Sequence, residues 1–177
     1  INGNEVFIDP GISIIVGPGA TLTIENGAHL HACTNMWQGI ILTDASSQLN
    51  ILTGSIIEDA ENAVSADAGG NIQIIDATFD HNYVSVFLAN EDYSSSQIIG
   101  STFKCSNGYS LLPPHAGERS LYQIRLTRAD ITIGDPSSPN DISGSDQGIF
   151  LEDKFLNGQN IYNCNLHDFD NNPNTGL

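Results

Sequence analysis

The chain repeats one short phrase six times, as Leu22-Thr-Ile24, Leu49-Asn-Ile51, Ile72-Gln-Ile74, Ser96-Gln-Ile98, Ile131-Thr-Ile133 and Gln159-Asn-Ile161. Each copy ends on isoleucine and has an uncharged polar residue at its centre. The six isoleucines recur at intervals of 27, 23, 24, 35 and 28 residues. A period of about two dozen residues is typical of proteins in which each repeat stacks on its neighbours.

Two more apolar positions follow each phrase in the same order. The first lies five residues, or slightly more, after the isoleucine, and is filled by Leu30, Ile56, Phe79, Phe103, Ile142 and Leu166. The second comes later in the period, and is filled by Ile40, Val64, Val84, Ile124 and Ile149. Each period therefore holds three short strands, with corners at residue types that favour turns: Gly27, Gly54, Asp59, Asn82, Gly100 and Asn163.

Three strands per period predict an all-β fold, a right-handed parallel β-helix with three sheets and about six coils. Coils stacked at the ~4.8 Å strand spacing place each isoleucine under the next, so the interior is a ladder of like residues. The phrase centres face outward as an uncharged column, which avoids stacked like charges: Thr23, Asn50, Gln73, Gln97, Thr132 and Asn160. An antiparallel sandwich also has short strands, but it does not require three apolar sites in register. The length fits one domain, 1–177.

The composition argues against several kinds of partner. With 21 acidic and 5 basic residues, the net charge of −16 repels nucleic-acid phosphates and anionic lipid heads. No run of 18 apolar residues offers a membrane span. Because the three cysteines are an odd number, Cys105 has Cys33 or Cys164 as alternative disulfide partners. The abrupt start and end of the chain predict a module of a longer protein.

Three phrases carry a resemblance to a known family: Met36-Trp-Gln-Gly-Ile40, Ile57-Glu-Asp-Ala60 and Thr78-Phe-Asp-His-Asn-Tyr-Val84. With the repeat, they resemble the right-handed parallel β-helices of the pectate-lyase-like superfold, as found in large modular proteins exported by bacteria. The resemblance implies a secreted or cell-surface location. It leaves activity open, because this fold serves lyases, hydrolases, adhesins and passive stalks.

The long interval in the repeat is the first place to look for a site. Four of the five basic residues lie between residues 104 and 128, around an inserted loop at 105–121. Long excursions from a regular scaffold are where binding tends to reside. We expect an anion or a sugar to be bound there by Tyr109, His115, Arg119 and Arg125. The alternative is a corner insertion that binds nothing.

A second candidate site lies near the end of the chain. Asp168, Asp170 and Asn172 place oxygen donors at alternate positions, and oxygen donors are the ligands that calcium prefers. Calcium is therefore the one metal that we expect, and no other cofactor is indicated. The pattern lacks the closing glutamate of the twelve-residue calcium loop, so solvated turn residues are the alternative.

Several other side chains could carry chemistry. The repeat places Glu58, His81 and Cys105 at equivalent positions of successive coils, which predicts an acid–imidazole contact that is structural rather than catalytic. His29 and His31 are expected on opposite sides of one strand and so unable to bind one metal. Trp37 at a corner either stacks on a sugar ring or packs inside the corner.

These patterns favour a non-catalytic structural or adhesive module, with neighbouring domains or identical subunits covering the ends of the solenoid. Identical subunits that cover these ends would stack end to end into a fibre. The alternative is a domain that binds or cleaves polysaccharide. A groove lined by carboxylates, arginine and aromatic rings along one sheet would distinguish that alternative from a passive stalk. The sequence lacks the catalytic motifs of the pectin hydrolases of this fold: Asn-x-Asp, Asp-Asp, Gly-His-Gly and Arg-x-Lys.

Overall fold

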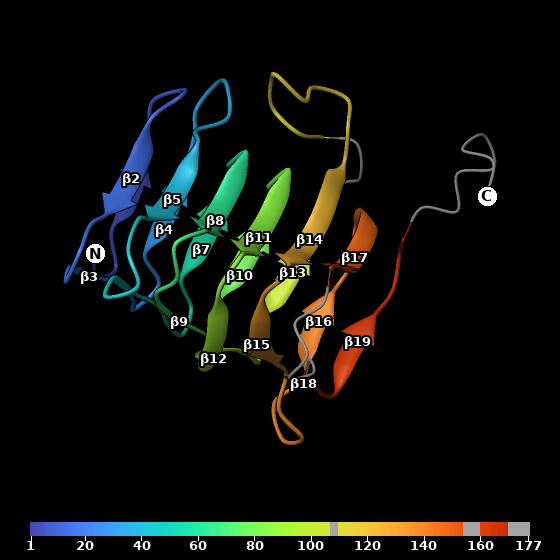
Figure 1. Cartoon of the computed structure of the whole chain (residues 1–177). Coiled ribbons are helices and arrows are strands. Elements are labelled where there is room, and N and C mark those ends of the chain that lie inside the picture. The colour runs from blue at the N-terminus through green and yellow to red at the C-terminus, as the bar shows by residue number, and fades with distance from the viewer. Residues whose placement is uncertain (107–109, 154–159, 170–177) are drawn as a thin grey trace.

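The chain folds as a parallel β-solenoid of about six turns with three sheets (Figure 1). A computed structural model describes residues 1–106, 110–153 and 160–169, which contain nineteen strands and no helix. Every pairing between neighbouring strands of a sheet is parallel. The all-β, three-sheet architecture expected from the repeat is therefore confirmed, and an antiparallel sandwich is excluded. The handedness of the coil stays a prediction.

Successive strands along the chain belong to three sheets in turn, here named sheets A, B and C. Sheet A contains β1 (Glu5–Phe7), β4 (His29–His31), β7 (Ile56–Glu58), β10 (Thr78–Asp80), β13 (Thr102–Lys104), β16 (Asn140–Ile142) and β19 (Cys164–Leu166). Sheet B contains β2 (Ser13–Val16), β5 (Gly39–Leu42), β8 (Asn62–Ala66), β11 (Val84–Ala89), β14 (Ser120–Thr127) and β17 (Ser145–Glu152). Sheet C contains β3 (Thr21–Ile24), β6 (Gln48–Ile51), β9 (Asn71–Ile75), β12 (Asp92–Ile99), β15 (Asp130–Ile133) and β18 (Asn160–Ile161). One strand from each sheet makes one coil.

Sheet C carries the phrase that defines the repeat. Its six isoleucines pair in register from β3 to β18, and the first five are buried. The uncharged polar residues beside them pair in the same order, as the sequence predicts. Within this outer column, the Asn50 side-chain amide donates to the Thr23 hydroxyl at 3.3 Å. The interior ladder and the uncharged, in-register outer column are thus confirmed.

Two positions of the predicted alignment are displaced. In sheet A, Ile57 rather than Ile56 pairs with Phe79 in the interior ladder. Ile57 lies six residues after the sheet C isoleucine, whereas Phe79 and Phe103 lie five residues after theirs, and the longer corner turns at Gly54 with a φ of +78°. In sheet B, Val86 rather than Val84 pairs with the preceding valine and the following isoleucine of the ladder. Corner lengths vary between coils, so counting from one isoleucine misplaces the later strands.

The corners are stabilised by left-handed backbone and by buried amides. Asp59 and Asn163 have positive φ angles, as do the predicted corner glycines. Asn82 acts differently, because its buried side chain accepts from the Ala60 N–H and donates to the Ile57 carbonyl, both at 2.9 Å. These bonds join neighbouring coils where the ladder is interrupted, and they satisfy backbone groups that would otherwise be buried without partners.

Large side chains fill the interior between the corners. The Phe79 and Phe103 rings stack with centroids 4.9 Å apart. Trp37 is fully buried and donates from its indole N–H to the Glu58 carbonyl at 2.7 Å, so it packs inside the corner and is not exposed for sugar stacking. The hydroxyl of buried Tyr93 donates to the Ala66 carbonyl at 2.9 Å.

The interior ladder predicts that two neighbouring residues of one strand contribute very differently to the free energy of unfolding. Ile74 is buried between its partners in two adjacent coils, whereas Gln73 beside it faces outward. Ile74→Ala removes buried methyl groups and leaves a cavity, so the free energy of unfolding should fall by about 2–5 kcal/mol. Gln73→Ala, the matched control, should cost less than about 1 kcal/mol. Urea denaturation followed by circular dichroism measures both, and equal losses would contradict this register.

Candidate functional site

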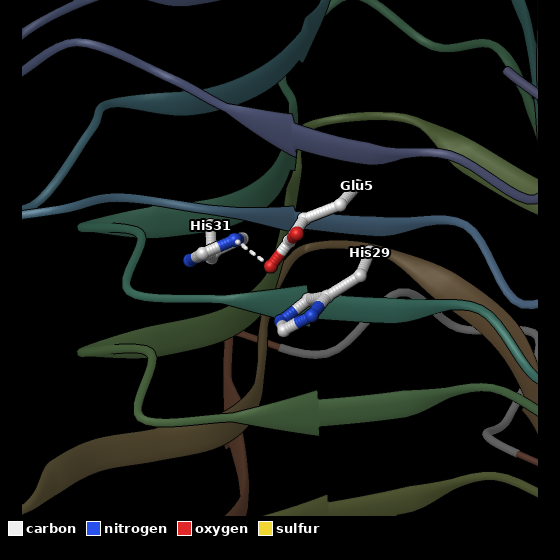
Figure 2. Close-up of side chains that lie close together, drawn as sticks. All are labelled: Glu5, His29 and His31. Carbon is white, nitrogen blue, oxygen red and sulfur yellow. Dashed lines mark hydrogen bonds and ion pairs between the residues drawn. The ribbon is translucent and has the colours of Figure 1, made fainter.

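The outer face of sheet A carries a row of acids and imidazoles. His29 and His31 lie on the same side of β4, with stacked rings whose centroids are 4.3 Å apart (Figure 2). The expectation that they face opposite sides is wrong, because side chains two residues apart on a strand share a face. Nε2 of His31 lies 3.2 Å from Oε1 of Glu5 on the neighbouring strand β1. Nε2 of His29 lies 2.7 Å from Oε2 of Glu58 on the other side.

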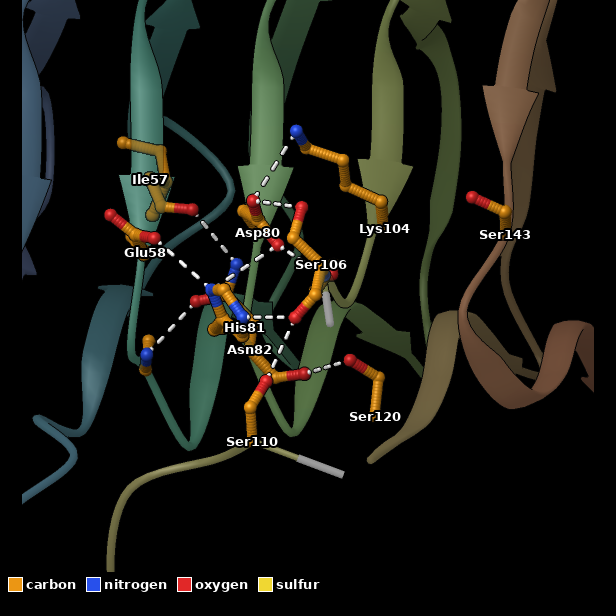
Figure 3. Close-up of polar contacts among 12 residues, drawn as sticks. Ile57, Glu58, Asp80, His81, Asn82, Lys104, Ser106, Ser110, Ser120 and Ser143 are labelled. Atoms are coloured by element: carbon orange, nitrogen blue, oxygen red, sulfur yellow. Dashed lines mark hydrogen bonds and ion pairs between the residues drawn. The ribbon is translucent and has the colours of Figure 1, made fainter. Parts of the chain in front are cut away.

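The row continues over the next two coils (Figure 3). Nδ1 of His81 lies 3.1 Å from Glu58 and 3.3 Å from Asp80. Both oxygens of the Asp80 carboxylate accept from Ser106, one from its N–H at 2.9 Å and one from its hydroxyl at 2.8 Å. Lys104 lies 3.4 Å from the same carboxylate. His81 and Lys104 therefore lie beside the carboxylates of Glu58 and Asp80 across these coils.

The predicted acid–imidazole contact exists, although the predicted register does not. Glu58 pairs with Asp80, and Asp80 with Lys104, while His81 lies one residue further along at a corner with a φ of +52°. Cys105 is buried in a small apolar cluster with Met36 and Leu111. None of the three cysteines forms a disulfide.

Electrostatic coupling in this row shifts several pKa values. The hydrogen bond with Glu58 raises the pKa of His81 to about 9, and the same bond lowers the pKa of Glu58. The pKa of Asp59 rises to about 6, chiefly because burial disfavours its charged form, and also because Glu58 is a like charge nearby. At neutral pH the Glu58–His81 contact is therefore an ion pair.

A groove on the outer face of sheet B is the second feature. It has a volume of about 300 Å³ and crosses β5, β8, β11 and β14. We call it the Arg125 groove, and its lining residues are Ile41, Asn62, Ser65, Ala66, Asp67, Val84, Phe87 and Arg125. A row of outward side chains runs along the groove, because Ser65 pairs with Phe87 and Phe87 pairs with Arg125 in the sheet. Each outward side chain thus lies beside its counterpart one coil away.

Arg125 lies against aromatic rings. Its guanidinium carbon is 5.1 Å from the centre of the Phe87 ring and 5.6 Å from that of Tyr122. Tyr122 in turn stacks on Phe150, with centroids 5.0 Å apart. Nη2 of Arg125 donates to Glu152 at 3.1 Å, which lowers the pKa of that carboxyl group. The Nε–H of Arg125 is shielded and has no hydrogen-bond partner among the described residues.

The residues predicted for the inserted loop are described in part, and each described one has contacts of its own. His115 stacks on Tyr83, with centroids 3.5 Å apart, and bonds to Glu118. Arg119 donates to the carbonyl of Asp168 at 2.6 Å. Arg125 lies on β14, outside the loop, because that strand begins at Ser120. Tyr109 lies outside the described residues.

The predicted calcium ligands are described only in part. Asp168 accepts from His167 at 2.8 Å, while Asp170 and Asn172 lie outside the described residues. Within the described part of the chain, groups of three or more potential ligands from His, Cys, Asp and Glu occur at two other places. These are Glu5 with His29 and His31, and Glu58 with Asp80 and His81.

The aromatic residue of the Arg125 groove was not predicted from the sequence, although the repeat indicates its position. Each outward residue directly follows an interior residue of sheet B. With Val86 in the ladder, Phe87 takes the outward position beside Arg125, and Arg125 in turn lies beside Phe150. The sequence alignment put Val84 in the interior ladder instead, so this row of outward side chains was not predicted.

No protein-family model, curated protein or solved structure matches the chain. Among the described residues, there is no helix with the length and hydropathy that a membrane span requires.

The Glu58–His81 pair predicts a pH-dependent contribution to stability. Because the pKa of His81 is raised to about 9 in the folded state, its stabilising effect is complete below its unfolded value of ~6.5 and is lost as the pH rises through about 9. Glu58 has a lowered pKa, so its effect is lost only as the pH falls below its unfolded value of ~4.3.

His81→Asn tests this, since asparagine tolerates the positive φ at this corner. The difference in free energy of unfolding between wild type and variant should be largest near pH ~6 and shrink by pH ~10. Urea denaturation at several pH values measures it. A difference that stays constant over this range would refute the ion pair.

Proposed function

We propose that the chain is a rigid, non-catalytic module of a secreted or cell-surface protein, and that it adheres to polysaccharide through the Arg125 groove. The observation that supports this most is a hollow on one sheet that is lined by Arg125, the carboxylate Asp67 and the aromatic ring of Phe87, with small polar side chains beside them. Arginine, carboxylate and aromatic ring are the kinds of group that distinguish a sugar-binding solenoid from a passive stalk.

The groove offers both kinds of contact that a sugar ring requires. Phe87 presents an apolar surface for the C–H face of a sugar, in the way that aromatic side chains line many ligand sites. Asn62, Ser65 and Asp67 present donors and acceptors for hydroxyl groups. Arg125 adds a planar, fixed-charge donor set suited to a sugar carboxylate or to paired hydroxyls.

Arg125 is also held ready for a ligand. Its guanidinium is fixed by Glu152 and by the rings of Phe87 and Tyr122, so little side-chain freedom is lost on binding.

Binding rather than cleavage is the better-supported function of the groove. Glycoside hydrolysis uses two carboxyl groups that flank the bond. Asp67 is the one carboxylate among the lining residues, and the nearby Glu152 is engaged with Arg125 and Thr127. A polysaccharide-cleaving domain remains the alternative, and release of reducing ends from a bound polysaccharide would establish it.

The wider setting is also a proposal. The quoted phrases support a place in the right-handed pectate-lyase-like superfold and in exported bacterial proteins, and parallel crossovers are right-handed in ~98% of cases. The outer edges of β1, β2 and β3 have no neighbouring strand among the described residues, which supports their being covered by neighbouring domains or identical subunits. Light scattering over a concentration series tests self-association, and a persistent monomer would remove the identical-subunit form.

A polysaccharide-binding screen tests the groove. We expect the wild-type chain to bind at least one immobilised acidic or neutral polysaccharide, and Arg125→Gln to weaken that binding at least about tenfold through loss of charge-assisted hydrogen bonds. Arg128→Gln is the matched control, because it removes the same charge from a turn residue that bonds to Asn90. Its affinity should stay at the wild-type level. Equal effects of the two substitutions, or no binding to any polysaccharide, would refute the proposal.

A further inference from the structure

We propose that Glu5, His29 and His31 form a binding site for a divalent transition metal ion such as Zn²⁺. The site lies on the outer face of sheet A, whereas the Arg125 groove lies on sheet B. The metal-site proposal therefore does not depend on the proposed function. One ring nitrogen from each histidine and one carboxylate oxygen from Glu5 would be the protein ligands. Glu58 would orient His29.

The stacked strands bring these three groups together. Glu5 pairs with His29 across the parallel strands β1 and β4, and His31 follows on the same face of β4. The potential ligand atoms of all three side chains lie within 4.8 Å of one another (Figure 2). Tetrahedral Zn²⁺ with bonds of ~2.0–2.1 Å needs ligand atoms ~3.3 Å apart. Rotation of the Glu5 side chain, which is 59% exposed, supplies this contraction, while the His31 ring is 14% exposed and is held in place by Phe7 and His29.

The type of donor selects the class of metal. Two imidazoles with one carboxylate suit zinc and other first-row transition metals, whereas calcium and magnesium require shells made mostly of oxygen. The exposure of Glu5 leaves room for water to complete the coordination. The site is therefore of the open kind, with three protein ligands.

Glu58 gives His29 the support that metal-binding histidines commonly have. Its Oε2 lies 2.7 Å from Nε2 of His29, so it accepts the N–H there and leaves Nδ1 with a lone pair for the metal. Glu58 is itself fixed by His81 in the next coil. A metal bound in this way would tie together strands β1, β4 and β7.

The neighbouring group of Glu58, Asp80 and His81 is the less suitable metal site. Both ring nitrogens of His81 are engaged, Nδ1 with Glu58 and Nε2 with the carbonyl of Ser106 (Figure 3). Both oxygens of Asp80 already accept from Ser106. A metal would have to break these contacts, whereas at Glu5 and His31 it replaces one exposed hydrogen bond.

Isothermal titration of the full chain with ZnCl₂ tests the site. We expect binding of one Zn²⁺ ion that excess Mg²⁺ and Ca²⁺ do not displace. His31→Gln and Glu5→Gln should each weaken the affinity at least about tenfold, and Glu58→Gln by about 10–100-fold, as for other partners that orient a ligand. Circular dichroism of each variant establishes that it is folded before its affinity is compared.

Controls use the other candidate ligands of the chain. His115→Gln, in the segment before β14, and Cys33→Ser, an exposed thiol, should leave the affinity unchanged. The Zn²⁺ complex should also unfold at a higher temperature than the chain in EDTA, and His31→Gln should abolish this difference. The proposal is overturned by the absence of Zn²⁺ binding, or by binding that persists in His31→Gln and disappears in Cys33→Ser.

Discussion

The rest of the structure depends on the in-register parallel pairing of successive coils. Backbone hydrogen bonds hold neighbouring strands ~4.8 Å apart, so each side chain lies beside its counterpart from the previous coil. Inside, this requires like apolar residues, as in the ladder from Ile51 through Ile74 to Ile98. Outside, it makes functional neighbours of residues that are distant in sequence. Phe87 contacts Arg125, and Glu5 contacts His31, for this one reason.

The same pairing makes charge placement on the outer faces critical. Like charges stacked at this spacing repel, and the chain limits this repulsion in different ways. The outer column of sheet C is uncharged. On sheet A, the carboxylates of Glu58 and Asp80 come from directly paired positions, and His29, His81 and Lys104 lie beside them and offset their charge. Three imidazoles of this acidic chain, His29, His31 and His81, thereby lie in one row beside carboxylates.

The sequence predicts the architecture well because interior ladders repeat the same residue types. The isoleucines of sheet C and their polar neighbours were placed correctly. Sheets A and B follow corners of unequal length, so Ile57 and Val86 were missed by one and two positions. The two-residue error at Val86 hid Phe87 and with it the groove. The loop residues His115 and Arg119 were grouped by sequence proximity, and the sequence gives no sign of their contacts, which are with Tyr83 and with the carbonyl of Asp168.

The in-register stack is tested most directly by distances between spin labels in the outer column of sheet C. Labels are attached at cysteine pairs 23/97 and 23/132, with the three native cysteines replaced by alanine. Thr23 and Gln97 lie three coils apart, and Thr23 and Thr132 four coils apart. At ~4.8 Å per coil, pulsed electron resonance should give mean backbone separations of about 14 Å and about 19 Å. Separations that do not increase by about one strand spacing between the two pairs would contradict the stacked solenoid.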